Sequence, residues 1–319
     1  MRRLGVGVIG VGYWGRNHVR VLSELRRADV VAVCDVDANR AREVAEMFRV
    51  PAYYTDSEDL LDNDDVEAVT ICTWSTVLAE EARKALEAGK HVLVEKPMAR
   101  DWREASELVE MAEREDLVLA VGFVERFNPG VNEVRKLINE GELGDVVILS
   151  AKRLSRWPRR HGDVGVLKDL AIHDIDLSRF LLGEEPRSVF ASIGRLKRMD
   201  LDDHAFVVLG FPGGCTSFIE ANWLTPRKKR ELRVTGSEAI VTLDYLSQRV
   251  IIEREDGAYE PTVKWREPLK LELEHFVDSV LNGKTPIASG RDGLMALRIC
   301  DLALASSRKG QVVSLAGEL

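Results

Sequence analysis

Six residues near the start of the chain, Gly10 to Gly15, have the spacing of a phosphate-binding loop. They read G-x-G-x-x-G, directly after the apolar run Leu4 to Ile9 and directly before a helical stretch. In that context Gly10 allows a tight turn, Gly12 lets the backbone approach a pyrophosphate, and Gly15 lets the helix pack on the strand. We therefore expect this loop to bind a dinucleotide, with the pyrophosphate at the helix N-terminus.

The acidic residue Asp35 ends a second apolar run, about 20 residues beyond the glycine loop. A carboxylate at this place accepts hydrogen bonds from both adenosine ribose hydroxyls and repels a 2′-phosphate. Val36 and Asp37 follow it, and Arg40 is the nearest cation that could offset the repulsion. We expect NAD as the cofactor, with NADP disfavoured.

Two further segments carry residue types that suit the oxidation of an alcohol. Lys96, within Glu95-Lys96-Pro97, follows a strand-like run, at the carboxyl edge where such sheets bind ligands. Asp169, His173 and Asp176 lie in a helical stretch, and their spacing places them on one helix face. Oxidising a carbinol needs a base for the hydroxyl proton and a donor that polarises the same oxygen. His173 and Lys96 have these two capacities.

Each of these residues also has a plainer interpretation. His173 could be a helix histidine satisfied by a nearby carboxylate, and Lys96 could form a surface ion pair. Asp169, His173 and Asp176 could together bind a metal. Hydride transfer between NAD and an alcohol needs no metal, however, so we expect none.

Three more residues are candidates for contacting the cofactor. Tyr13 and Trp14 lie inside the glycine loop and could flank the dinucleotide, although an aromatic residue in a loop often only packs. Glu95 either contacts the nicotinamide ribose or caps the turn that follows its strand.

The composition restricts the class of protein. The 319 residues are 45% hydrophobic and 31% charged, which is typical of a globular chain long enough for two domains. A net charge of −8 argues against a general nucleic-acid binder. The apolar runs end far short of the roughly 18 residues that span a bilayer. Scattered cysteines and an N-terminus without a cleavage-site pattern favour a cytoplasmic protein.

The positive charge that exists is clustered. On an acidic protein such clusters suggest local anion recognition or subunit contacts, or simply a solvated face. One cluster comprises Lys152, Arg153, Arg156, Arg159 and Arg160, and the other comprises Arg227, Lys228, Lys229 and Arg230.

The first 122 residues alternate strand-like and helical stretches with short connections. Asp101 and Glu104, for example, form a capping-box pattern that opens a helix to about residue 114. The runs between the helices are nearly continuous in apolar residues, which indicates a parallel sheet covered on both faces. We therefore predict an α/β fold whose N-terminal domain, 1–122, is a doubly wound Rossmann sheet.

After Gly122 the pattern changes. Strand-like runs between residues 146 and 253 are separated mostly by turns, such as Phe211-Pro212-Gly213-Gly214, which predicts a mainly antiparallel sheet. Residues 123–319 are therefore expected to form an α+β domain that binds the substrate and mediates oligomerisation. Its helices are predicted at about 129–139, 167–182, 269–282 and 291–308.

From the glycine loop to the last helix the chain resembles the glucose–fructose oxidoreductase / inositol dehydrogenase / rhizopine catabolism (Gfo/Idh/MocA) family. The resemblance rests on Gly10 to Gly15, on the stretch Ala88 to Pro97, which reads AGKHVLVEKP, and on the pair Asp169-x-x-x-His173. It implies an NAD(P)-binding Rossmann domain, an open-faced C-terminal sheet, and frequent dimers or tetramers. It also implies that Lys96, Asp169 and His173 line the active site, so we expect these three to be catalytic and to contact the substrate.

Three segments resemble the branch of this family that acts on sugar nucleotides, which includes UDP-N-acetylglucosamine 3-dehydrogenases. The first segment makes Arg126 and Asn128 candidates for substrate binding. The basic cluster ahead of Asp169 would suit a diphosphate or a carboxylate, so Arg153 and Arg156 are further candidates. The three segments are Val124 to Pro129, Asp163 to Asp176 and Asn222 to Pro226.

One segment departs from the family pattern. After the fourth strand many members read Thr-Pro-x-x-x-His near the cofactor, whereas this chain has Thr73-Trp74 and then Leu78. By position Thr73 and Trp74 remain candidates for cofactor binding. Because Trp74 replaces the proline and Leu78 the histidine, detailed contacts on the nicotinamide side are not carried over from the family.

Together these residues predict an NAD-dependent oxidoreductase that transfers a hydride from a sugar hydroxyl to the nicotinamide, with a sugar nucleotide as the expected substrate. We expect His173 to take the hydroxyl proton, Lys96 to hydrogen-bond the same oxygen, and Asp169 to orient a neighbouring hydroxyl or the base. Three alternatives stay open: a dehydrogenase of a free sugar or inositol, an enzyme that uses NAD transiently to cleave a glycosidic bond, and a non-enzymatic NAD-binding sensor. The expected partners are the small-molecule substrate and further copies of the chain, as a homodimer or homotetramer, and neither nucleic acid nor a membrane.

Overall fold

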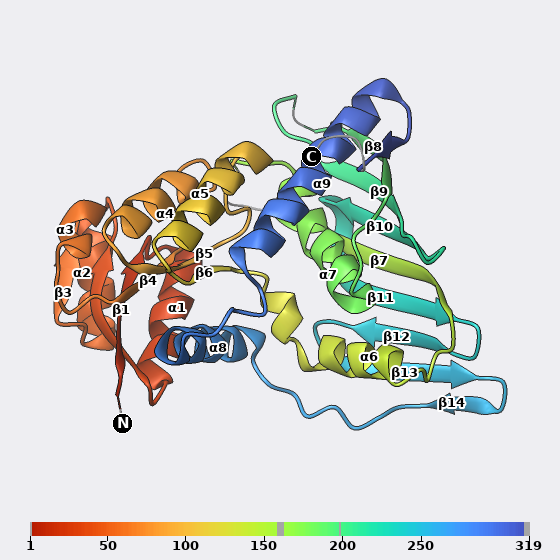
Figure 1. Ribbon diagram of the computed structural model, residues 1–319, viewed down its shortest axis with the longest axis horizontal. Coiled ribbons are helices and arrows are strands. Elements are labelled where there is room, and N and C mark those ends of the chain that lie inside the picture. Colours follow the sequence, from red (N-terminus) through yellow and green to blue (C-terminus); the bar gives the residue numbers. More distant parts are fainter. Residues whose placement is uncertain (1, 158–162, 198, 316–319) are drawn as a thin grey trace. The chain divides into compact units, whose positions relative to one another are not determined.

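The computed structural model of the protein describes residues 2–157, 163–197 and 199–315 (Figure 1). The chain divides into two compact units, Met1–Val124 with Glu267–Met295, and Glu125–Arg266 with Ala296–Leu319. A single cut between residues 122 and 123, as drawn from the sequence, differs from this division. The difference arises because a segment near the C-terminus returns to pack in the first unit.

The first unit is built on a parallel six-stranded sheet in the order β3-β2-β1-β4-β5-β6. This is the strand order of a doubly wound dinucleotide-binding sheet, whose ligand site lies beside the carboxyl ends of the strands where the order reverses. The Rossmann sheet predicted from the sequence is therefore confirmed. Its strands are β1 (Leu4–Ile9), β2 (Ala28–Cys34), β3 (Ala52–Tyr54), β4 (Ala68–Ile71), β5 (His91–Val94) and β6 (Leu119–Val121).

Helices cover both faces of this sheet, with α4 and α5 along one face and α1 and α8 along the other (Figure 1). Helix α8 buries Leu269, Leu273 and Phe276 in one apolar core with Val19 and Leu22 of α1. Full burial of such a side chain is worth about 1.5–3 kcal/mol, which explains why this late segment joins the first unit. The helices are α1 (Tyr13–Glu24), α2 (Ala38–Phe48), α3 (Ser57–Leu61), α4 (Leu78–Glu87), α5 (Trp102–Arg114) and α8 (Pro268–Asn282).

The second unit is built on a nine-stranded sheet in the order β14-β13-β12-β11-β7-β10-β9-β8-β15. Its neighbouring strands are antiparallel except for β7 and β10, which run parallel. The mainly antiparallel sheet predicted from the turns is thus confirmed. Its strands are β7 (Val146–Arg156), β8 (Ser188–Gly194), β9 (His204–Gly210), β10 (Thr216–Asn222), β11 (Leu224–Gly236), β12 (Ile240–Asp244), β13 (Arg249–Arg254), β14 (Gly257–Tyr259) and β15 (Val313–Ser314).

One face of this second sheet is covered by helices α6 and α7 (Figure 1). Within the described ranges the opposite face carries no helix, and Ile148 and Phe206 are exposed on it. The sheet is therefore open-faced. The remaining elements are the 3₁₀ turn η1 (Val124–Phe127), α6 (Pro129–Asn139), the π-helical turn η2 (Leu167–Ala171), α7 (Ile172–Leu182) and α9 (Gly290–Lys309), which begins in the first unit and ends in the second.

Among the described residues no helix is long and apolar enough to cross a membrane. Elements that the sequence did not predict are short, as in β3, α3, β14 and β15, so their hydrophobic pattern is too brief to detect.

Candidate active site

The glycine loop connects β1 to α1 in the first unit. Gly10 has a φ of +82°, which favours glycine, and a Cβ at Gly15 would lie 1.8 Å from the Gly10 carbonyl oxygen. Replacing either glycine would therefore strain the turn or separate the helix from it. A Cβ at Gly12, in contrast, meets nothing within 4 Å in the described part of the chain, so the backbone there is open to an approaching group.

The N-terminus of α1 suits an anion. Gly12 is its N-cap and provides no side-chain cap, and the first turn contains no acidic residue. First-turn N–H groups have no partner inside the helix and carry the positive end of its dipole, so a pyrophosphate can accept from them. Tyr13, the first residue of α1, is 87% exposed.

Asp35 lies just beyond β2, buried beside the glycine loop. Its Oδ2 accepts from the Val11 N–H at 3.0 Å, and its Oδ1 accepts from the Asp37 N–H at 3.0 Å. Arg40, at the start of α2, also donates to Oδ1 at 2.9 Å. The carboxylate is thus anchored to the backbone of the glycine loop. Arg40 partly neutralises the charge of Asp35, as the sequence suggested it could.

Glu95, directly after β5, connects two of the predicted cofactor contacts. Its Oε1 accepts from the indole Nε1 of Trp14 at 2.6 Å, and its Oε2 accepts from the Lys96 backbone N–H at 3.2 Å. His18 of α1 is fully buried, with its Nε2 3.4 Å from Glu95 Oε1. A Cβ at Gly122 would lie 2.7 Å from the same oxygen, so glycine is needed there to leave room for Glu95.

The loop after β4 contains the departure from the family pattern. Thr73 and Trp74 follow β4 at the same carboxyl edge as the glycine loop, and Trp74 is 56% exposed. Leu78 begins α4 and is fully buried. A histidine at this position would place a polar ring in the core, so the leucine here serves packing.

Asp169 and His173 lie in the second unit, where η2 leads into α7. Both are buried, at 7% and 9% exposure. The sequence predicted an α-helix through this whole stretch, whereas residues Leu167–Ala171 form a π-helical turn. Such turns are frequent at functional sites. Asp202 accepts from the Leu167 N–H at 2.8 Å, and Gly165 leaves room for this carboxylate, so the start of the helix is fixed.

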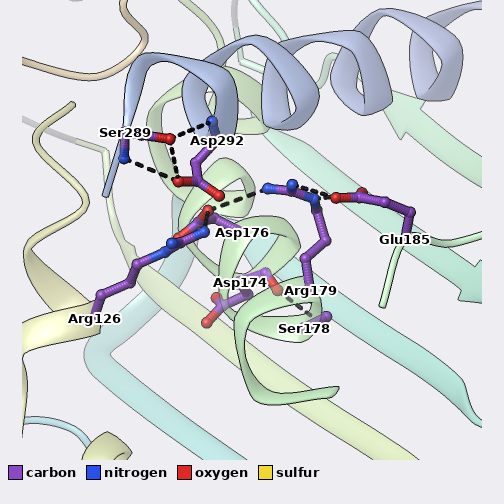
Figure 2. Close-up of polar contacts among 8 residues, drawn as sticks. All are labelled: Arg126, Asp174, Asp176, Ser178, Arg179, Glu185, Ser289 and Asp292. Atoms are coloured by element: carbon purple, nitrogen blue, oxygen red, sulfur yellow. Dashed lines mark hydrogen bonds and ion pairs between the residues drawn. The ribbon is translucent and has the colours of Figure 1, made fainter. Parts of the chain in front are cut away.

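Arg126 and Asp176 form a buried pair on η1 and α7 (Figure 2). Arg126 Nε and Nη2 donate to the two carboxylate oxygens of Asp176 at 2.7 and 2.6 Å. Arg179 lies 3.5 Å from Asp176 and continues the chain to Glu185, to which its Nε donates at 2.6 Å. Arg126, a candidate for substrate binding, therefore pairs with Asp176 of α7.

Arg153 of β7 is also held by carboxylates. Its Nε donates to Asp174 at 2.6 Å and its Nη1 to Glu125 at 2.9 Å, while the Tyr245 hydroxyl donates to Asp174 at 3.0 Å. Burial alone would lower the pKa of Arg153, but Asp174 and Glu125 raise it overall. Sequence reasoning missed Glu125, Asp174 and Tyr245. For Asp174 the sequence did offer a signal, because this charged residue directly follows the candidate His173.

The other substrate candidates have different surroundings. Asn128 is the N-cap of α6, accepts from the Gly130 N–H at 3.0 Å and donates to the Tyr245 carbonyl at 3.0 Å. Arg156 is exposed at the end of β7. Arg159 and Arg160 lie outside the described residues.

Lys96 belongs to the first unit, whereas Asp169 and His173 belong to the second. Within the first unit the structure brings together the glycine loop, Asp35 and Glu95 at one sheet edge. No group of three His, Cys, Asp or Glu side chains that could hold a metal occurs among the described residues.

A Rossmann sheet with an open glycine loop, an unblocked helix N-terminus and an acidic residue after β2 defines a dinucleotide-binding protein. Residues 4–123 match the family described as "Oxidoreductase family, NAD-binding Rossmann fold", and residues 131–242 match the "GFO/IDH/MocA C-terminal domain". The chain belongs to the Gfo/Idh/MocA family of oxidoreductases. The family resemblance, the oxidoreductase class and the NAD-binding domain expected from the sequence are therefore confirmed.

Relatives span almost the whole chain. A myo-inositol 2-dehydrogenase of Thermotoga maritima is 28% identical over 97% of this chain and 98% of its own. A UDP-N-acetylglucosamine 3-dehydrogenase of Acidithiobacillus ferrooxidans is 30% identical over 93% of this chain and 95% of its own. A solved structure of a UDP-N-acetylglucosamine 3-dehydrogenase from the same organism superposes with a TM-score of 0.88 at 28% identity, covering 97% of this chain and 99% of the other.

Proposed function

We propose that this protein oxidises a secondary hydroxyl of a sugar or polyol to a ketone, with NAD as the hydride acceptor and a sugar nucleotide as the substrate. The observation that carries the proposal is the position of Lys96 beside Glu95, at the sheet edge shared with the glycine loop and Asp35. A lysine there lies on the cofactor side of the domain, where it can reach a reacting oxygen.

The residues divide the chemistry as follows. NAD, held by the glycine loop and Asp35, would supply the hydride acceptor for this oxidation. His173 takes the hydroxyl proton, so that the alcohol loses one hydride and one proton and becomes a ketone. Lys96 donates a hydrogen bond to the same oxygen, and Asp169 orients a neighbouring hydroxyl or the histidine. Burial of Asp169 and His173 supports these roles, since a base acts best in a site from which water is largely excluded.

Two substrate classes are supported by the relatives. The sugar-nucleotide assignment draws on the UDP-N-acetylglucosamine 3-dehydrogenase of A. ferrooxidans, which matches in sequence, and on a solved structure of such an enzyme. A free inositol or sugar is the second candidate, and the T. maritima relative favours it. The pairing of Arg153 with Asp174 and Glu125 also favours it, because that charge is already neutralised within the protein.

The test is NADH fluorescence in the presence of NAD and each candidate substrate. UDP-N-acetylglucosamine and its uronic acid represent the first class, and myo-inositol and glucose the second. A fluorescence increase with a nucleotide sugar, absent with the free compounds, is the expected result. An increase only with inositol or glucose would overturn the sugar-nucleotide assignment, and no increase with any of the four would overturn the dehydrogenase proposal for these substrates.

A further inference from the structure

Arg230 of β11 lies on the sheet face that carries Arg153, and Lys228 carries a second positive charge near both arginines. Arg230 pairs directly with Arg153 across β11 and β7, and directly paired residues of neighbouring strands point to the same face. Arg153 bonds to Asp174 of α7, so this face is the one that α7 covers. Lys228 lies two residues before Arg230 on the same strand.

The partners of Arg153 and Arg230 differ. Two carboxylates hold Arg153, as described above. Arg230 is 8% exposed, and its hydrogen bonds within the described ranges run from Nη1 to the neutral backbone carbonyls of Leu154 and Lys229, at 3.1 and 3.2 Å. Its Nε and Nη2 donors are left available to a ligand.

Without a bound anion, the positive charges of Arg153, Arg230 and Lys228 repel one another. Like charges directly opposite each other on neighbouring strands repel. Burial, and then the charge of Arg153, lowers the pKa of Arg230 to about 10. Burial, followed by Arg230 and Arg153, lowers the pKa of Lys228 as well. An anion bound here would reverse these effects, because charge-assisted hydrogen bonds to a guanidinium and an ammonium favour their charged forms.

The position relative to Asp169 sets the shape of the ligand. Turn η2, which carries Asp169, packs over β10 and β9, and β11 is separated from β10 by β7. Two strand spacings amount to about 10 Å. This is the separation of the backbones, and a ligand with a hydroxyl at one end and an anionic group at the other can reach both places.

We propose that Arg230 and Lys228 form a subsite for an anionic group, a phosphate, diphosphate or carboxylate, of the substrate whose hydroxyl lies at Asp169 and His173. The reference to the substrate rests on the function proposed above, whereas the affinity for an anion does not. A sugar nucleotide needs a positive charge for its diphosphate. Arg153 does not supply it, because Asp174 and Glu125 already neutralise this arginine, whereas Arg230 and Lys228 would supply it.

Isothermal titration calorimetry on the full-length protein saturated with NAD tests the subsite. Saturation blocks the cofactor site, so a nucleotide probe cannot bind there. UDP represents a diphosphate, D-glucuronate a carboxylate, and myo-inositol a neutral polyol. We expect UDP or D-glucuronate to bind, with an affinity that falls as salt rises, and the stronger of the two identifies the anion.

Arg230→Gln should weaken that binding by about 10- to 100-fold, the loss expected for hydrogen bonds to a charged group. Lys228→Gln should weaken it less, and Arg230→Lys should restore part of the loss. Lys229→Gln is the matched control, because it removes the same charge from the same strand, but Lys229 alternates to the opposite face and pairs with Glu231 at 3.0 Å. Melting temperatures of all four variants show that each is folded.

The outcomes separate this inference from the proposed function. Equal affinities in Arg230→Gln and Lys229→Gln, or no binding of either anion to the wild type, would overturn the subsite even if a sugar is oxidised. Loss of anion binding in Arg230→Gln with no sugar oxidised would support the subsite and overturn the proposed function alone.

Discussion

The indole Nε1 of Trp14 donates a hydrogen bond of 2.6 Å to Oε1 of Glu95. Trp14 lies in the glycine loop after β1, and Glu95 follows β5, two strands away in the sheet. The bond therefore fixes the loop that would hold the pyrophosphate against the segment that carries Lys96. Gly122 leaves the space that this arrangement needs.

Replacement of Trp14 by Phe should weaken NAD binding several-fold and lower the free energy of unfolding by about 1–2 kcal/mol, because Oε1 of the mostly buried Glu95 loses the indole donor. Fluorescence titration with NADH and urea unfolding measure the two effects. Trp265→Phe is the control, since Trp265 is 59% exposed in the other unit. Identical results for the two variants would contradict this role of the Trp14–Glu95 bond.

Substitutions His173→Ala and Lys96→Met should each lower kcat by about 10²- to 10⁴-fold, the contribution typical of a positioned acid or base. The affinity for NADH should stay unchanged in His173→Ala, because His173 is assigned to the substrate. Steady-state kinetics and NADH titration give both values. If His173→Ala loses NADH binding instead, the histidine is structural.

The substitution Asp35→Ser should shift the ratio of kcat/KM for NADP over NAD upward by at least about tenfold. It removes a like charge from the 2′-phosphate, and such juxtapositions cost several kcal/mol. Arg40 would then be released to bind the phosphate, so adding Arg40→Gln to Asp35→Ser should reverse part of the shift. A ratio that stays at the wild-type value would show that Asp35 does not select the cofactor.

Breaking the Arg126–Asp176 pair should destabilise the second unit. Both side chains are almost fully buried, at 5% and 1% exposure, so Arg126→Leu leaves a buried carboxylate and should cost about 3–5 kcal/mol. The double variant Arg126→Leu/Asp176→Leu should lose less than the sum of the single variants. Urea unfolding measures each, and Arg100→Leu, which breaks an exposed pair with Glu104, should change little. Additive losses would rule out the coupling.

Two histidines of the first unit should make stability depend on pH. Burial lowers the pKa of His91 and of His275 from the usual 6.5, and each ring accepts a backbone N–H, from Val118 and Ile287. The unfolded chain therefore binds more protons, so stability is fully present above about pH 6.5 and falls as the pH drops below it. Denaturant unfolding at pH 7.5 and 5.5 should show a smaller loss in His91→Asn/His275→Gln, which keeps neutral acceptors at both places. An unchanged loss would assign the pH dependence to other groups.

The sequence by itself determined much of this protein. Gly10, Gly12 and Gly15 specify their loop because backbone geometry acts locally, and the periodicities of apolar residues predicted both sheets because burial patterns follow the pitch of each element. The pairing of Asp35 with the glycine loop was also accessible, since both occur within one βαβ unit. The same local signals carried the resemblance to the family.

Only the tertiary structure decided which charged residues are available to a ligand. Arg126, Arg153 and Arg230 are alike in sequence, yet two of them are held by Asp176 and Asp174 on α7, while Arg230 donates to neutral carbonyls. The carboxylates that pair with Arg126 and Arg153 lie 50 and 21 residues away in the sequence, so no local pattern could reveal them. The bond between Trp14 and Glu95 spans 81 residues for the same reason. Packing brings these partners together, and in a buried setting the partner, rather than the residue type, determines what an arginine can do.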